Sequence, residues 1–73
     1  MNILKAEKSL KEGKDIVLTC DYWERHEQHK FEADMFNPAS FRHMVKCIKN
    51  DFKDISTFYR GNKSDCKFNF IQI

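Results

Sequence analysis

Glycine and proline are scarce in this chain of 73 residues, which has two glycines, Gly13 and Gly61, and one proline, Pro38. A phosphate-binding loop needs several glycines close together, so the sequence excludes that class of nucleotide site. Hydrophobic runs are also short, and none approaches the roughly 20 residues that a membrane-spanning helix needs. We therefore predict no contact with a membrane.

Cysteine is present, but not as a disulfide framework. Cys20, Cys47 and Cys66 are odd in number and widely spaced, whereas small secreted domains usually carry an even set at short spacings. Residues 1–13 alternate Lys and Glu with short apolar residues, unlike the charged and then apolar pattern of a secretory leader. We expect an intracellular, cytoplasmic protein with reduced thiols.

Charge of one sign is only slightly in excess. Thirteen Lys and Arg against eleven Asp and Glu give a formal net charge of +2, too small to predict nucleic-acid binding from bulk charge. Hydrophobic residues make up 41% of the chain and aromatic residues 14%, which indicates a folded protein whose small core is filled by large rings. The length fits a single domain over residues 1–73.

The first half of the chain predicts a helix and a strand. Residues 3–12 have the pattern of an amphipathic helix, and Gly13 follows where a left-handed C-terminal cap is expected. Residues 15–23 are rich in β-branched side chains and predict a strand. Its apolar side is formed by Ile16, Leu18, Cys20 and Tyr22.

Residues 24–36 fit two structures. Phe31, Ala33 and Met35 alternate with charged residues at the period of a strand, which leaves residues 25–28 as a polar hairpin loop. Alternatively, good helix formers follow a capping box that Asp21 and Glu24 could make. We favour the strand, because a helix would place Glu27 in the middle of its apolar face.

Residues 37–53 carry the clearest pattern, that of an amphipathic helix. Asn37 offers an N-cap oxygen, and Pro38 suits the first helical position. Apolar residues recur at helical spacing and form one stripe, made of Phe41, Met44, Val45, Ile48 and Phe52. Cations recur as regularly, about 100° around the helix from that stripe, at Arg42, Lys46, Lys49 and Lys53. We predict that the stripe is buried and that the row of cations binds a partner.

The last part of the chain predicts two more strands. Residues 55–60 and 66–73 have strand-like composition and flank turn-forming residues at 61–65. The complete fold is then α+β, in the order α-β-β-α-β-β. We expect a single-layer antiparallel sheet of about four strands with two helices on one face.

Two further groups are candidate partner contacts. Arg60 and Lys63 cluster at the second predicted hairpin and extend the basic surface. Trp23, the only tryptophan, is expected on the strand side away from the main core, where an aromatic residue can anchor an interface. Equally, the N-terminal helix could cover that side and make Trp23 a core residue.

Metal and catalytic sites lack the spacing that would predict them. His43 and Cys47 are four residues apart on a helix and share a side, but no Cys-x-x-Cys pair accompanies them. Small buried thiols explain the cysteines more simply. A Cys–His nucleophile would also need an orienting third group, oxyanion donors and a cleft, which no motif indicates. We predict no catalytic residue, no metal and no cofactor.

These features together predict a non-catalytic interaction module. We expect it to block a larger host protein or nucleoprotein complex sterically, by docking its basic helix flank in an acidic groove. The composition, rich in Lys, Asn, Phe and Ile, resembles that of small proteins of low-GC phages and mobile elements. Many such proteins inhibit host machinery, as anti-CRISPR proteins do. The alternative is a small nucleic-acid-binding regulator, acting as a homodimer if one sheet face is open.

Overall fold

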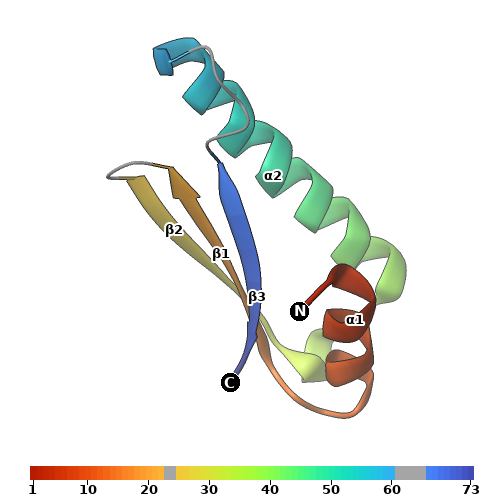
Figure 1. Ribbon diagram of the computed structural model, residues 1–73. Helices are drawn as coiled ribbons and strands as arrows, with labels where there is room; N and C mark the ends of the chain where they lie inside the picture. The colour runs from red at the N-terminus through yellow and green to blue at the C-terminus, as the bar shows by residue number, and fades with distance from the viewer. Residues whose placement is uncertain (23–24, 61–65) are drawn as a thin grey trace.

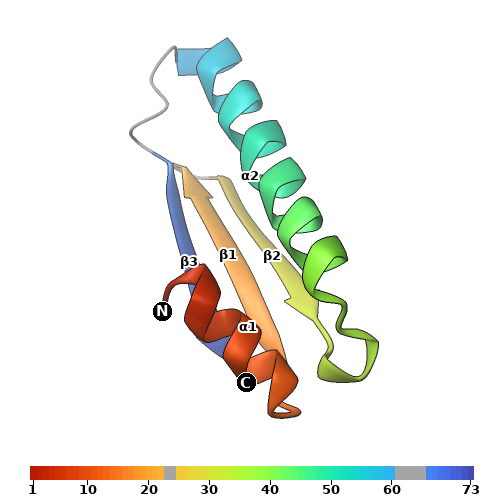
Figure 2. The ribbon, with the colours of Figure 1, turned by 90° about the vertical axis from the view of Figure 1, so that its right-hand side faces the viewer.

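The fold consists of two helices packed on one antiparallel sheet. A computed structural model describes residues 1–22, 25–60 and 66–73, with the backbone alone for residues 55–60. The elements in these ranges are α1 (Ile3–Lys11), β1 (Ile16–Tyr22), β2 (Arg25–Phe31), the 3-10 turn η1 (Ala33–Met35), α2 (Pro38–Arg60) and β3 (Lys67–Gln72). The strand order is β2-β1-β3, and both helices lie on the same face of the sheet (Figures 1 and 2). The α+β class is confirmed, with three strands in the described residues where about four were predicted.

Local signals determine where α1 begins and ends. The Asn2 side chain accepts a hydrogen bond from the Lys5 N–H at 2.9 Å, which satisfies one of the free amides of the first turn. Gly13 has a φ of +88°, the left-handed conformation that glycine adopts without a Cβ clash. The predicted cap is confirmed, and Ala6 and Leu10 are buried.

The core lies between the helices and the inner face of the sheet. The four residues predicted to share one side of β1 are all buried, and Leu18 and Cys20 lie opposite Phe70 and Phe68 of β3. From α2, Phe41 and Phe52 are buried against them, together with Val45. The predicted apolar stripe was one residue too wide, because the side chain of Met44 is 51% exposed on the flank of the helix.

Residues 55–60 are the end of α2 and not a strand. Their β-branched and aromatic side chains favour a strand by propensity. However, no glycine or proline interrupts the chain between Pro38 and Gly61, and extending an existing helix adds one hydrogen bond for each residue fixed. The predicted second hairpin is therefore wrong, and the order of helices and strands in the described residues is α-β-β-α-β. The predicted turn at 61–65 lies outside the described residues.

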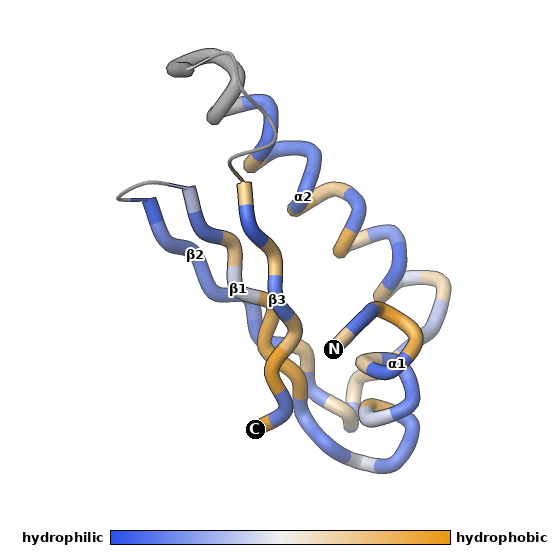
Figure 3. The backbone as a smooth tube through the Cα atoms, viewed as in Figure 1, coloured by the Kyte–Doolittle hydropathy of each residue, from blue (hydrophilic) through white to orange (hydrophobic). Residues whose placement is uncertain are grey.

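Residues 25–28, predicted as a hairpin loop, belong to β2. Tyr22 pairs with Arg25 and Ile16 pairs with Phe31, so the predicted loop is wrong at residues 25–28. The preference for a strand over a helix is right as far as Phe31. Figure 3 shows β2 as hydrophilic along most of its length, which an edge strand tolerates because water reaches much of it. The prediction fails beyond Phe31, where residues 33–35 form η1 and Asp15 Oδ1 accepts the Ala33 N–H at 2.9 Å.

Candidate partner-binding site

The flank of α2 that faces β3 carries a groove lined by cations. We call it the cationic groove; its volume is about 250 Å³ and its lining residues are Ile3, Arg42, Val45, Lys46, Lys49, Asn50 and Lys53. The structure thus brings all four cations of the predicted row into one place. Of the aliphatic lining residues of the groove, Val45 belongs to the core and Ile3 packs against the core.

Arg42 is the one member of the row that is paired among the described residues. Its Nε donates to Oε1 of Glu7, and its Nη2 lies 3.1 Å from Oε2 of the same carboxylate. Glu7 is buried, and its hydrogen bond to the Arg42 guanidinium lowers the pKa of the carboxyl, against the opposing effect of desolvation. Arg42 therefore joins α2 to α1 and contributes less free charge to the groove.

Lys49 and Lys53 lie across aromatic rings of β3. The Lys49 Nζ is 5.4 Å from the Phe68 ring centroid and 5.5 Å from that of Phe70, and the Lys53 Nζ is 5.5 Å from that of Phe68. Such contacts are attractive and hold the stems over the core edge while the ammonium groups reach water. Within the described residues, the ion pairs do not include Lys46, Lys49 or Lys53.

Beside the opposite flank of α2, the charged side chains of β2 are paired with one another. The Arg25 Nη2 lies 2.6 Å from Oε2 of Glu27, and His29 Nε2 lies 3.3 Å from Oε1 of the same carboxylate. The hydrogen bond from Arg25 is the main reason why the pKa of Glu27 is lowered. The Arg25 guanidinium also stacks on Phe52, 5.6 Å from its ring centroid. Because these charges are paired with one another, this flank should attract a charged partner only weakly.

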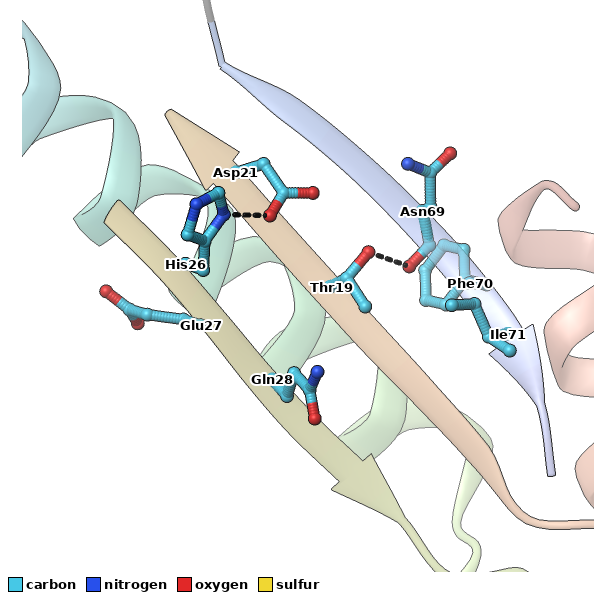
Figure 4. A pocket seen from close by; sticks show the side chains of 8 residues that line it. All are labelled: Thr19, Asp21, His26, Glu27, Gln28, Asn69, Phe70 and Ile71. Atoms are coloured by element: carbon cyan, nitrogen blue, oxygen red, sulfur yellow. Dashed lines mark hydrogen bonds and ion pairs between the residues drawn. The ribbon is translucent and has the colours of Figure 1, made fainter. Parts of the chain in front are cut away.

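The outer face of the sheet forms a polar hollow of about 580 Å³, which the two helices leave uncovered (Figures 1 and 4). His26 Nδ1 lies 2.7 Å from Asp21 Oδ1, and the Thr19 hydroxyl donates to the Asn69 carbonyl oxygen at 3.3 Å. The Thr19 hydroxyl therefore bonds to the backbone of β3. The polar groups of this hollow are thus partly paired with one another.

Of the cysteines and histidines singled out in the sequence, His43 and Cys47 meet on α2, and Cys20 lies in the core. Cys47 Sγ is 3.6 Å from His43 Nε2 on the exposed side of α2, whereas burial raises the pKa of Cys20 to about 11. Cys20 is therefore a protonated, apolar core residue at neutral pH. In the part of the chain that the structure describes, no three His, Cys, Asp or Glu residues form a group that could hold a metal ion.

Three of the predicted contact residues cannot be placed. Trp23 and Lys63 lie outside the described residues, as does the side chain of Arg60, the last residue of α2. Their roles stay predictions. Sequence reasoning missed Ile3 and Asn50 as groove residues, because Ile3 reaches the groove only through the packing of α1 on α2.

No protein-family model matches the chain, and searches of curated proteins and of solved structures found no match. Among the described residues, neither helix has the length and apolar character needed to cross a membrane. We infer function from the geometry and charge of the cationic groove.

Proposed function

We propose that this protein is a non-catalytic interaction module that binds an acidic surface of a larger macromolecule through the cationic groove. The observation that carries the proposal is the grouping of Lys46, Lys49 and Lys53 in one groove. None of the three has a carboxylate partner in the described part of the chain. Three unpaired cations on one flank repel one another, and an anionic partner would relieve that repulsion.

The spacing of these cations supports a joint action. Lys46 and Lys53 are seven residues apart, which corresponds to about 10 Å along a helix that rises 1.5 Å per residue. This separation is close to the Debye length of about 8 to 10 Å at physiological salt. Their fields therefore add, and the flank would attract an acidic partner and orient it during approach.

The side chains in and beside the groove favour a protein partner over a single-stranded nucleic acid. Binding of single strands relies on exposed rings on which bases stack. Phe70 is buried, and Phe68 is partly buried beneath Lys49 and Lys53. Ile3, which is partly buried, offers an aliphatic contact instead. Steric blocking of a host protein, as by a phage- or mobile-element-type inhibitor, is part of the proposal and is supported by the composition alone.

Charge reversal tests the proposal. Lys46→Glu/Lys53→Glu changes the groove, and Lys5→Glu/Lys8→Glu makes the same change in net charge on exposed α1 residues outside the groove. Fluorescence anisotropy with a labelled oligoglutamate peptide should show at least a tenfold loss of affinity for the first variant. The second should bind within about twofold of the unmodified protein, and circular dichroism melts should show that both fold.

Two results would contradict the proposal. Equal losses of peptide affinity in both variants would mean that binding depends on the net charge of the protein and not on the cationic groove. Tighter binding of a labelled single-stranded oligonucleotide, falling log-linearly between about 50 and 200 mM salt, would favour the nucleic-acid-binding regulator.

A further inference from the structure

We propose that the ligand of the cationic groove is an extended acidic peptide segment of the partner, which adds a strand to the free edge of β3. This inference rests on the proposed function and specifies its partner. It follows from the juxtaposition, within the described residues, of a strand edge that no other strand pairs with and a group of lysines that have no carboxylate partner.

The free edge follows from the sheet order. β3 pairs with β1 on one side, and within the described residues no strand pairs with its other side. The Ile73 N–H donates to the Asp15 carbonyl at 3.1 Å, and this pair continues the register that places Ile16 opposite Gln72. Hydrogen-bonded and non-bonded pairs alternate along an antiparallel ladder. The odd-numbered residues of β3 therefore bond to β1, and Phe68, Phe70 and Gln72 direct their N–H and C=O groups to the free edge.

The cations lie over the same residues. The side chains of Phe68 and Phe70 point to the inner face, and the ammonium groups of Lys49 and Lys53 lie above their rings. Ser9 of α1 hydrogen-bonds to Gln72 at 3.3 Å, and Figure 2 shows α1 across the C-terminal part of β3. The accessible part of the edge is therefore the stretch around Phe68 and Phe70, directly beside the lysines.

Strand geometry then defines the ligand. Successive side chains of a strand point to opposite faces of the sheet, so alternate residues of an added strand would rise toward Lys46, Lys49 and Lys53. Carboxylates fit these positions. The residues between them would lie on the outer face beside Asn69 and Ile71, whose side chain is 52% exposed, where β-branched residues fit. The ligand class is an extended segment that alternates Asp or Glu with β-branched residues.

The strand edge also discriminates between classes of polyanion. In strand addition, main-chain hydrogen bonds supply affinity and alternate side chains supply specificity. A phosphodiester backbone could meet the lysines, but it has no N–H groups for the carbonyls of Phe68 and Phe70. The edge of β2 offers no comparable site, because the charges beside it are already paired.

Backbone N-methylation of a synthetic peptide tests strand addition. The probe is a labelled, acetylated peptide of repeated Glu-Val units, compared with one copy N-methylated at every glutamate amide and another at every valine amide. All three carry the same charge. Because an added strand presents only one of its edges to β3, methylation of one set should weaken binding at least tenfold. Methylation of the other set should leave the affinity within about twofold of that of the unmethylated peptide. Which of the two sets is sensitive shows whether the added strand is parallel or antiparallel to β3.

Equal behaviour of the two methylated peptides, whether both bind or neither does, would overturn strand addition. The Lys46→Glu/Lys53→Glu protein keeps this failure distinct from that of the proposed function. If it loses the unmethylated peptide while both methylated peptides bind normally to the unmodified protein, the cationic groove binds acidic ligands by another geometry. If it binds the unmethylated peptide normally, both proposals are wrong.

Discussion

The two edge strands of the sheet flank α2 on opposite sides, and their charges are arranged in opposite ways. Beside β2, Glu27 is bound by Arg25 and His29, so the charges balance within a few ångströms. Beside β3, Lys49 and Lys53 lie over aromatic rings and have no carboxylate partner among the described residues. A net charge of only +2 thus conceals a local excess on one flank. The proposed binding site rests on this placement of charge more than on its total amount.

Phe52 connects the two flanks, and its removal should have the largest effect. The Arg25 guanidinium lies over its ring on one side, and the Phe68 ring packs edge-on at 5.8 Å on the other. Phe52→Ala should cost about 3 to 5 kcal/mol, a large part of the roughly 4 to 11 kcal/mol that a domain of this size has. Chemical denaturation followed by circular dichroism should show a mostly unfolded or strongly destabilised protein.

Met44→Ala is the matched control on the same helix. The Met44 side chain is half exposed, so its truncation should change the unfolding free energy by no more than about 0.5 kcal/mol. Similar losses of unfolding free energy in Phe52→Ala and Met44→Ala would contradict the observed difference in burial between these two side chains.

The sequence predicts features that depend on neighbouring residues. The N-cap of α2 is an example, since the Asn37 side chain accepts the Ser40 N–H at 3.0 Å. The alternation that buries Ile16 and Leu18 is another, because side chains of a strand point alternately to opposite faces. Each of these features follows from a few adjacent residues and the geometry of one element.

Features that depend on tertiary packing could not be predicted. Glu7 and Arg42 are 35 residues apart, and nothing in the sequence around either one indicates that they meet. The end of α2 was mispredicted for a related reason. The strand propensity of residues 55–60 is a local preference, and continuation of the helix outweighed it. The row of cations was predicted from spacing, but which of them are paired was decided by α1.

Glu7→Gln should make the β3 flank more basic. Without the carboxylate, Arg42 would become a fourth unpaired cation in the cationic groove. Affinity for the oligoglutamate peptide should rise by roughly two- to fivefold, the size usual for one exposed ion pair, while Tm falls slightly. Anisotropy titration at neutral pH measures the first effect. Unchanged or weaker binding would show that Arg42 is a structural residue outside the binding surface.

Glu27→Gln tests the β2 flank and should have the smallest effect. Arg25 and His29 would lose the negative charge of the carboxylate that they share, and Tm should fall by about 1 to 3 °C at neutral pH. Affinity for the acidic peptide should stay unchanged, because the proposed binding site is on the other side of α2. An increase comparable to that of Glu7→Gln would mean that any unpaired cation attracts the peptide, which would remove the distinction between the flanks.

The pH dependence of this variant identifies the cause. Arg25 lowers the pKa of Glu27 below its ordinary value of 4.5 in the folded protein, so the folded state binds the proton more weakly than the unfolded state. The stabilisation is therefore complete above that ordinary value and is lost as the pH falls through the lower, folded pKa. Melts of both proteins over this range should differ at neutral pH and converge in acid. A difference in Tm that persists in acid would assign the effect to packing and not to the Glu27 charge.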